Sequence, residues 1–249
     1  MTGIDSPESV ADAISSMPRP SLLVFDCDGV LAPLVDHADD SVLHEGVGEH
    51  LTMLAAQDGV TVAVLSGRSL DGLAQFDFHE SIVVAGSYGG ERRGIGSPPL
   101  SDGEAALLHR LDEIVVAAAD AAGDGAWVER KPTSVVVHVR EAHPSRRDDA
   151  LDLARTLSAE LSGHEVHDGS DVVELMARPT DKGTGLDRLR DEFDPASVLY
   201  IGDDVPDEDA FARLVGSGDI GVKVGPGETA AMLRLEGPAA VRLLLDHLT

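Results

Sequence analysis

The sequence has one cysteine, few lysines and aromatic residues, and no long apolar segment. The single cysteine, Cys27, excludes an internal disulfide and leaves no cysteine cluster for zinc, which is typical of a reducing compartment. No run approaches the roughly 20 apolar residues that cross a bilayer, and residues 1–20 lack a basic, apolar leader. We therefore expect a cytoplasmic protein with no membrane association.

Positive charge is also scarce. The chain has 19 lysines and arginines against 45 acidic residues, a formal net charge of −26, and its lysines are Lys131, Lys182 and Lys223. Without a basic surface, binding to nucleic acid or to anionic membranes is disfavoured. The composition favours a high-salt cytoplasm, where the Debye length falls to about 3 Å at 1 M salt and screens self-repulsion. An ordinary acidic protein tuned for solubility is the alternative.

Short apolar runs that end in polar residues indicate the fold of the core. Of the 249 residues 43% are hydrophobic, enough for a sizeable interior. Leu22–Phe25 and Val60–Leu65 have the composition of strands buried on both faces, and the apolar spacing within Glu45–Gln57 predicts a helix between them. Further strands are expected at Ile82–Ala85, Val198–Ile201 and Gly221–Val224. Strands alternating with helices predict an α/β fold, a doubly wound parallel sheet of the Rossmann-like kind.

The middle of the chain has a different pattern. A helix is expected over Glu104–Ala119, and within Ala126–Arg140 a period of two indicates a half-solvated strand of an antiparallel sheet. A second helix and another strand should follow, at about Arg147–Leu161 and Asp171–Met176.

This pattern predicts an inserted α/β module of residues 98–178, within a core domain of residues 1–97 and 179–249. Between the module's second helix and last strand, His164 and His167 share the spacing of some metal sites. Their polar surroundings, without thiols, indicate a surface loop instead.

Two carboxylates follow the first predicted strand directly. Asp26 and Asp28 are separated by Cys27, and Gly29 allows a tight turn that returns Asp28 over the end of the strand. Ligands of open parallel sheets bind beyond the carboxyl ends of strands. One carboxylate can attack phosphorus while the other protonates the leaving oxygen, so the pair predicts covalent phosphoryl transfer, against the alternative of a solvated turn.

Phosphate-binding groups are expected after the second strand and at a later helix start. Ser66 and Gly67 offer a hydroxyl and backbone N–H groups at a strand-to-helix turn. Lys182 is one of three lysines, and its ammonium can neutralise both a nucleophilic carboxylate and a phosphate oxygen. The alternatives are an ordinary turn and a chance lysine at a helix start.

The stretch Gly202–Phe211 places five acids in seven positions after the fourth core strand. Such crowding is costly without a cation, and a set of oxygen ligands without histidine favours Mg²⁺. An acidic helix N-terminus is the competing interpretation, which accounts for Asp207 but not for Asp203.

Taken in order, Asp26 and Asp28, then Ser66, Lys182, and Asp203 with Asp204 resemble the motifs of the haloacid dehalogenase-like phosphatase superfamily. More narrowly the chain resembles its trehalose-6-phosphate phosphatase family. The stretches that carry this closer similarity are Leu31–Pro33, Gly86–Arg92, Glu129–Arg140, Val173–Leu175 and Gly202–Phe211.

The resemblance implies a role for each of these residues. Asp26 would be the nucleophile and a metal ligand, and Asp28 the acid and base that also binds Mg²⁺ through its backbone carbonyl. Ser66, Gly67 and Lys182 would bind phosphate, and Asp203 would bind Mg²⁺. Asp204 and Asp207 would support the metal site, and the inserted module would be a cap that binds sugar through Glu129, Lys131, Arg140 and Glu174. Ordinary cross-strand charge pairing is the alternative for these last four.

The expected function is magnesium-dependent hydrolysis of trehalose 6-phosphate through a phospho-aspartyl intermediate, with a small phosphorylated disaccharide as partner and a monomeric enzyme. Two alternatives stay open. One is a phosphatase for another compatible-solute sugar phosphate, such as that of sucrose, mannosylglycerate or glucosylglycerol. The other is a non-catalytic protein that binds sugar phosphates, which would tolerate the loss of residues such as Asp26 that this chain retains.

Overall fold

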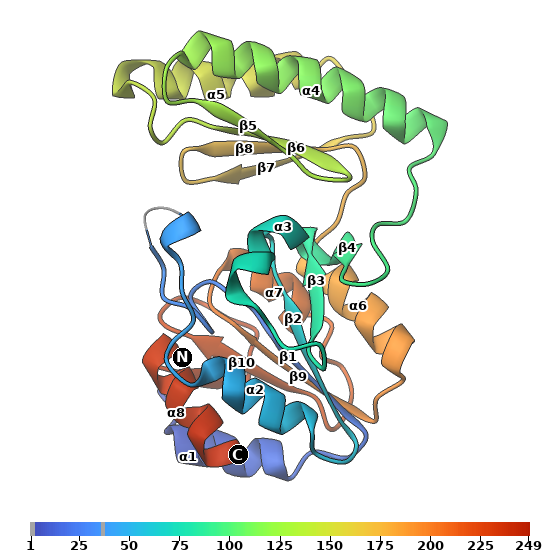
Figure 1. Cartoon of the computed structure of the whole chain (residues 1–249), viewed down its shortest axis with the longest axis vertical. Coiled ribbons are helices and arrows are strands. Elements are labelled where there is room, and N and C mark those ends of the chain that lie inside the picture. Colours follow the sequence, from blue (N-terminus) through green and yellow to red (C-terminus); the bar gives the residue numbers. More distant parts are fainter. Residues whose placement is uncertain (1–2, 36–37) are drawn as a thin grey trace. The chain divides into compact units, whose positions relative to one another are not determined.

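The structure is a computed structural model that describes residues 3–35 and 38–249. The chain forms two compact units, one of Met1–Gly96 with Asp181–Thr249 and the other of Ser97–Thr180, so the second is an insertion in the first (Figure 1). None of the helices in the described ranges is long and apolar enough to span a bilayer.

The first unit is built on a seven-stranded sheet with the order β11-β10-β9-β1-β2-β3-β4. Neighbouring strands are parallel, except that β4 runs antiparallel to β3. The strands are β1 Ser21–Phe25, β2 Val60–Leu65, β3 Val83–Gly86, β4 Glu91–Arg92, β9 Ser197–Gly202, β10 Ile220–Val224 and β11 Leu233–Leu235. The predicted α/β fold with a largely parallel core sheet is confirmed.

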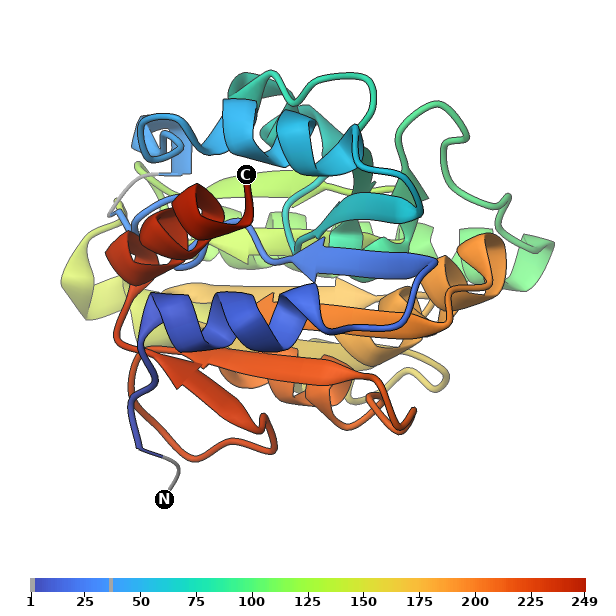
Figure 2. The same cartoon turned by 90° about the horizontal axis from the view of Figure 1, so that it is seen from below.

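Helices cover both faces of this sheet because its central strands are apolar on both faces. In β1, Leu23 and Phe25 pack in one apolar cluster, whereas Leu22 and Val24 pack in another. The first cluster includes residues of the helices α1 Pro7–Ser15, α2 Val47–Ala55 and α8 Pro238–Leu248, and the second includes residues of α6 Lys182–Phe193 and α7 Val205–Phe211. Helices α1 and α8 lie side by side (Figures 1 and 2). Short helical segments complete the unit: η1 Ala38–Asp40, α3 Leu70–Leu73, η2 Ala74–Phe76 and η3 Ser87–Gly89.

The second unit is a four-stranded antiparallel sheet, in the order β5-β6-β8-β7, covered on one face by two helices. Its elements are α4 Asp102–Ala122, β5 Trp127–Arg130, β6 Ser134–His138, α5 Pro144–Ser158, β7 Glu165–Gly169 and β8 Val172–Met176. The inserted antiparallel module expected from the sequence is therefore present.

Two predictions for this unit are corrected by the structure. Residues 126–140 form two strands joined by a turn, β5 and β6, because Lys131 donates its N–H to the Ser134 carbonyl and closes a hairpin. His167 lies in a strand, β7, and not in a loop. The predicted loop is wrong because β7 is an edge strand whose polar residues are mostly solvent-exposed, so it has no apolar alternation.

Arg178 ties together the two ends of the inserted unit. Its guanidinium donates to both carboxylate oxygens of Glu104, each at 2.8 Å, and to the backbone carbonyls of Pro98 and Pro99 at 3.0 and 2.8 Å. Arg178 follows the last strand of the unit and Pro98 precedes its first helix, so entry and exit of the insertion are held side by side.

Candidate active site

Three of the predicted site residues follow adjacent strands of the core sheet. Strand β1 lies between β2 and β9, and Phe25 is in register with Val64 on one side and Ile201 on the other. The carboxyl ends of the three strands therefore meet, and the segments that follow them bring Asp26, Ser66 and Asp203 to the same edge. This is the position at which open parallel sheets bind ligands.

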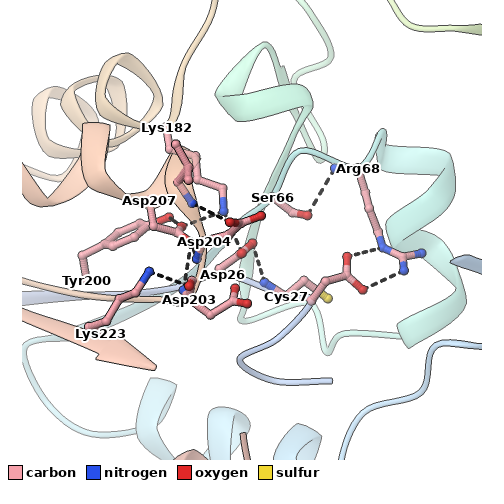
Figure 3. Close-up of polar contacts among 12 residues, drawn as sticks. Asp26, Cys27, Ser66, Arg68, Lys182, Tyr200, Asp203, Asp204, Asp207 and Lys223 are labelled. Carbon is pink, nitrogen blue, oxygen red and sulfur yellow. Dashed lines mark hydrogen bonds and ion pairs between the residues drawn. The ribbon is translucent and has the colours of Figure 1, made fainter. Parts of the chain in front are cut away.

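Lys182 links two buried carboxylates at this edge. It is the first residue of α6, and its Nζ lies 2.7 Å from the Asp26 carboxylate and 2.6 Å from that of Asp207. Figure 3 shows the lysine directed toward both. Asp26 and Lys182 are 6% and 4% exposed, so this ion pair is largely shielded from water. One Asp26 oxygen also accepts the Cys27 N–H at 2.7 Å, which orients the carboxylate.

Asp207 is fully buried, and both of its oxygens accept two hydrogen bonds. One accepts from the Lys182 ammonium at 2.6 Å and the Tyr200 hydroxyl at 2.7 Å. The other accepts from the backbone N–H groups of Asp203 and Asp204, both at 2.9 Å. These four bonds use the ordinary capacity of a carboxylate. Asp207 therefore fixes the lysine and the loop after β9.

The charges in this cluster are unbalanced. Burial raises the pKa of Asp26 to about 8 against the pull of Lys182, and the Asp207 carboxylate adds to the rise. Burial also raises the pKa of Asp203 to about 6, again with a contribution from Asp207. Burial would raise the pKa of Asp207 as well, but Lys182 holds it below its ordinary value. One ammonium thus holds the pKa of Asp207 low but does not offset the effect of burial on the pKa values of Asp26 and Asp203.

This deficit of positive charge fits a bound cation. Carboxylate oxygens of Asp26, Asp203 and Asp207 lie within 4.8 Å of one another. Gly29 adopts a positive φ of 74°, and a Cβ there would lie 2.0 Å from an Asp203 oxygen, so the first loop lies tightly against that carboxylate. Lys223 donates to the Asp203 backbone carbonyl and so orients this residue (Figure 3). An all-oxygen donor set on one rigid edge matches the ligands that Mg²⁺ prefers.

The segment after β2 forms one wall of a cavity at this site. The cavity, of about 230 Å³, is lined by residues of all the predicted motifs: Asp26, Asp28, Leu34, Ser66, Gly67, Arg68, Tyr88, Lys182, Asp203, Asp204 and Pro206. The turn after β3 supports this wall, because Ser87 and Tyr88 donate their N–H groups to the carbonyls of Arg68 and Ser66 at 2.7 and 2.9 Å. A hydroxyl, N–H groups and a lysine in one cavity can hold the oxygens of a phosphate.

A larger hollow of about 460 Å³ lies elsewhere on the first unit, beside α2 and η2. The described residues that line it are Gly48, Glu49, Thr52, Met53, Asp77 and His79, with two carboxylates and no lysine or arginine. That lining does not suit an anionic substrate.

The two remaining acids of the predicted core site, Asp28 and Asp204, have different surroundings. Asp28 makes a two-pronged contact with Arg68, whose Nε and terminal nitrogen lie 2.6 and 2.7 Å from its two oxygens. Asp204 is exposed and caps α7, and its carboxylate accepts the N–H of Val205 at 2.7 Å. The acidic helix start that the sequence offered as an alternative is present, because Asp207 and Glu208 lie in the first turn of α7, whereas Asp203 lies outside the helix.

The four residues expected to bind sugar all lie in the inserted unit and all make contacts there. Lys131 and Glu174 form a buried pair with both oxygens 3.1 Å from the ammonium, and Ser134 donates its hydroxyl to the same carboxylate. The other two contacts are Glu129 with His138 at 3.1 Å and Arg140 with Asp171 at 3.9 Å. Charge pairing, the alternative weighed from the sequence, is thus present at all four.

Sequence reasoning missed three side chains of the core site: Tyr200, Lys223 and Arg68. Tyr200 lies within an apolar strand, so the sequence gives no sign that its hydroxyl reaches the site. Arg68 follows Ser66 and Gly67, and the sequence does not distinguish its role from that of a residue in an ordinary turn. Lys223 could have been found, because the argument from scarce lysines applies to it equally. All three lysines, Lys131, Lys182 and Lys223, are less than 10% exposed, so none serves a general surface role.

The largely parallel sheet, the aspartate after its central strand, the lysine opposite and the acid cluster after β9 define a phosphatase of the haloacid dehalogenase-like superfamily. Comparison with known proteins narrows this class. A family model described as trehalose-phosphatase matches residues 24–236, and the chain belongs to that family.

Individual relatives agree with this assignment. The trehalose-6-phosphate phosphatase of Escherichia coli is 30% identical over 90% of this chain and 85% of its own length. The trehalose-phosphate phosphatase of Mycobacterium marinum is 35% identical over 91% of this chain, which spans only 60% of that longer protein. The fold matches the C-terminal domain of Candida albicans trehalose-6-phosphate phosphatase with a TM-score of 0.77 at 22% identity, covering all of this chain and 97% of that one.

Proposed function

We propose that the protein hydrolyses trehalose 6-phosphate to trehalose and phosphate through a phospho-aspartyl intermediate on Asp26. The observation that carries this proposal is the cavity in which Asp26, Lys182 and Ser66 meet at the carboxyl ends of adjacent strands. The names of the relatives support the sugar phosphate as substrate.

In the first step, an Asp26 oxygen forms a bond to phosphorus as the bond from phosphorus to the sugar oxygen breaks. The electron pair of that bond goes to the sugar oxygen, which takes a proton from the Asp28 carboxyl group. Lys182 neutralises charge on the phosphoryl group, and Ser66 and the Gly67 N–H orient its oxygens. In the second step, Asp28 takes a proton from water as the water oxygen attacks phosphorus and Asp26 is released.

Mg²⁺ is the proposed cofactor, held by Asp26, Asp203 and the Asp28 backbone carbonyl. When bound, it offsets charge on the phosphoryl oxygens and on the two carboxylates. Asp207 and Asp204 support this site: Asp207 by orienting the N–H groups of the β9 loop, and Asp204 by capping α7.

We assign the inserted unit as the cap that binds the sugar, through Glu129, Lys131, Arg140 and Glu174, with domain boundaries near residues 98 and 178. Remote sugar contacts then raise the rate of phosphoryl transfer as well as affinity. The proposed enzyme is monomeric.

The experiment compares release of phosphate from trehalose 6-phosphate, glucose 6-phosphate and p-nitrophenyl phosphate. We expect the highest kcat/KM on the disaccharide, and no turnover by Asp26→Asn, which should stay folded. Glu129→Gln should reduce the preference for the disaccharide while sparing the aryl phosphate. Asp148→Asn, an exposed change on α5 and therefore on the other side of the cap sheet, is the control. Equal efficiency on both sugar phosphates would favour one of the other sugar-phosphate substrates.

A further inference from the structure

Arg68 holds the carboxylate of Asp28 with an unusually complete set of contacts. Its Nε donates to one oxygen at 2.6 Å, and a terminal nitrogen donates to the other at 2.7 Å. The hydroxyl of buried Ser41 donates to the second oxygen as well, at 3.2 Å. Both oxygens of Asp28 are therefore fixed in direction.

Arg68 is itself held by the wall of the phosphate cavity. Its guanidinium lies 5.2 Å from the centre of the Phe76 ring, and its side chain is 14% exposed. Its backbone N–H donates to the Ser66 hydroxyl at 3.2 Å, and its carbonyl accepts from Ser87. The residue that restrains Asp28 thus belongs to the segment expected to hold phosphate.

The Asp28 carboxylate is also not a member of the close group of three acids in this site. The close group of carboxylates in the described part of the chain consists of Asp26, Asp203 and Asp207. In the view of Figure 3, Arg68 and Lys182 lie on either side of Asp26. The two acids of the first loop therefore contact different cations: Asp26 contacts Lys182, and Asp28 contacts Arg68.

We propose that Arg68 is the positioning residue for Asp28, which aims the carboxyl group for both of its proton transfers. This inference rests on the proposed function, in which Asp28 gives a proton to the sugar oxygen and later takes one from water. A carboxyl group that carries that proton has one oxygen as a donor, so the proton transfer requires one contact with Arg68 to open. The second contact keeps the group in place while this happens.

The fork of the guanidinium is essential to this role. Lysine offers a point charge on a flexible chain and cannot bind both oxygens of a carboxylate in one plane. The proposal therefore predicts different activities for Arg68→Lys, which keeps the positive charge, and Arg68→Met, which keeps only the approximate length of the side chain.

The test uses the dependence of the rate on the leaving group. An alkyl phosphate such as a sugar phosphate needs a proton on its leaving oxygen, whereas p-nitrophenolate leaves without one. We expect Arg68→Met to lower kcat/KM for trehalose 6-phosphate at least tenfold more than it lowers kcat/KM for p-nitrophenyl phosphate. Arg68→Lys should recover only part of the loss.

A double-mutant cycle shows whether Arg68 acts through Asp28. In the background of Asp28→Asn, Arg68→Met should have no further effect on the sugar phosphate. Thermal melting of each variant monitors the fold. An equal loss on both substrates would show that Arg68 binds the phosphoryl group and overturn the proposal, and so would additive effects in the cycle.

The outcomes also distinguish this inference from the proposed function. If the wild-type protein releases no phosphate from trehalose 6-phosphate, the proposed function fails. If the wild-type protein is active on both substrates and the Arg68 variants do not discriminate between them, only the role of Arg68 fails.

Discussion

Replacing Asp207 with asparagine removes one charge and almost no volume from the centre of the candidate site. The carboxylate accepts four hydrogen bonds, two at each oxygen. An asparagine amide has one oxygen and one NH₂ group, so one pair of donors must face an NH₂. Because the Lys182 ammonium carries a full positive charge, the amide oxygen should keep facing it, and we expect the NH₂ to face the neutral N–H groups of Asp203 and Asp204.

The cost follows from the bonds that are lost. Each hydrogen bond to a charged group contributes about 1.5–3 kcal/mol, so two of them amount to about 3–6 kcal/mol. Less repulsion at Asp203 offsets part of this loss. Less repulsion at Asp26 offsets a further part, since the Asp207 carboxylate also raises the pKa of Asp26. We expect Asp207→Asn to lower the free energy of unfolding by about 2–4 kcal/mol, or Tm by roughly 10 °C for a chain of this size.

The assay is thermal and urea unfolding of the metal-free protein at pH 7. Asp204→Asn is the matched control, since it removes the same charge from an exposed N-cap position where asparagine serves equally well. The control should lie within about 0.5 kcal/mol of the wild type. If Asp207→Asn is as stable as this control, the fourfold hydrogen bonding does not hold the β9 loop and the reasoning is refuted.

Three further predictions concern the metal, the first loop and the surface. Because the pKa values of Asp26 and Asp203 are raised, the folded metal-free protein keeps protons that the unfolded chain has lost, so its stability should fall as pH rises from about 4 to about 8. The rise in Tm caused by Mg²⁺ should therefore be larger at pH 8 than at pH 5, and an equal rise at both would contradict the assigned ligands. Gly29→Ala places a Cβ 2.0 Å from an Asp203 oxygen and should weaken activation by Mg²⁺ at least tenfold. Gly225 has a similar positive φ and no atom within 4 Å of such a Cβ, so Gly225→Ala should leave activation by Mg²⁺ unchanged. Activity titrations with Mg²⁺ compare the two variants. With a net charge of −26, Tm should fall as KCl is reduced from about 1 M to about 0.1 M, since the Debye length grows from about 3 to about 10 Å; a flat Tm would favour an ordinary acidic protein.

The core fold could be predicted because its central strands carry an unambiguous pattern. Val60–Leu65 was placed with the bounds that the structure gives to β2, since a short apolar run between polar residues is typical of a strand in a parallel sheet. Asp26, Ser66 and Asp203 each follow such a strand, so strand order alone brought them to one edge. Lys182 was identified because lysine is scarce in this chain.

Features that depend on tertiary contacts could not be predicted in this way. The hydroxyl of Tyr200 reaches Asp207, but in the sequence this residue is one more member of a buried strand. Strand β7 has no apolar alternation because it lies at the edge of its sheet. The fork between Arg68 and Asp28 joins residues 40 positions apart, and local patterns do not report such pairs.

The clamp formed by Arg178 has a consequence for how the chain folds. The core domain is interrupted by the whole of Ser97–Thr180, so pairing the two parts of its sheet means closing a loop of about 80 residues. If that segment is folded first, with Arg178 holding its ends together, the two parts of the core domain are joined by an effective connection of only a few residues. By the logarithmic dependence of loop entropy on length, this difference lowers the cost of closure by about 2–3 kcal/mol. The insertion has its own apolar cluster and is continuous in sequence, so it can form before β9 joins β1. Arg178 would then influence the rate at which the core assembles, although it lies outside the core sheet.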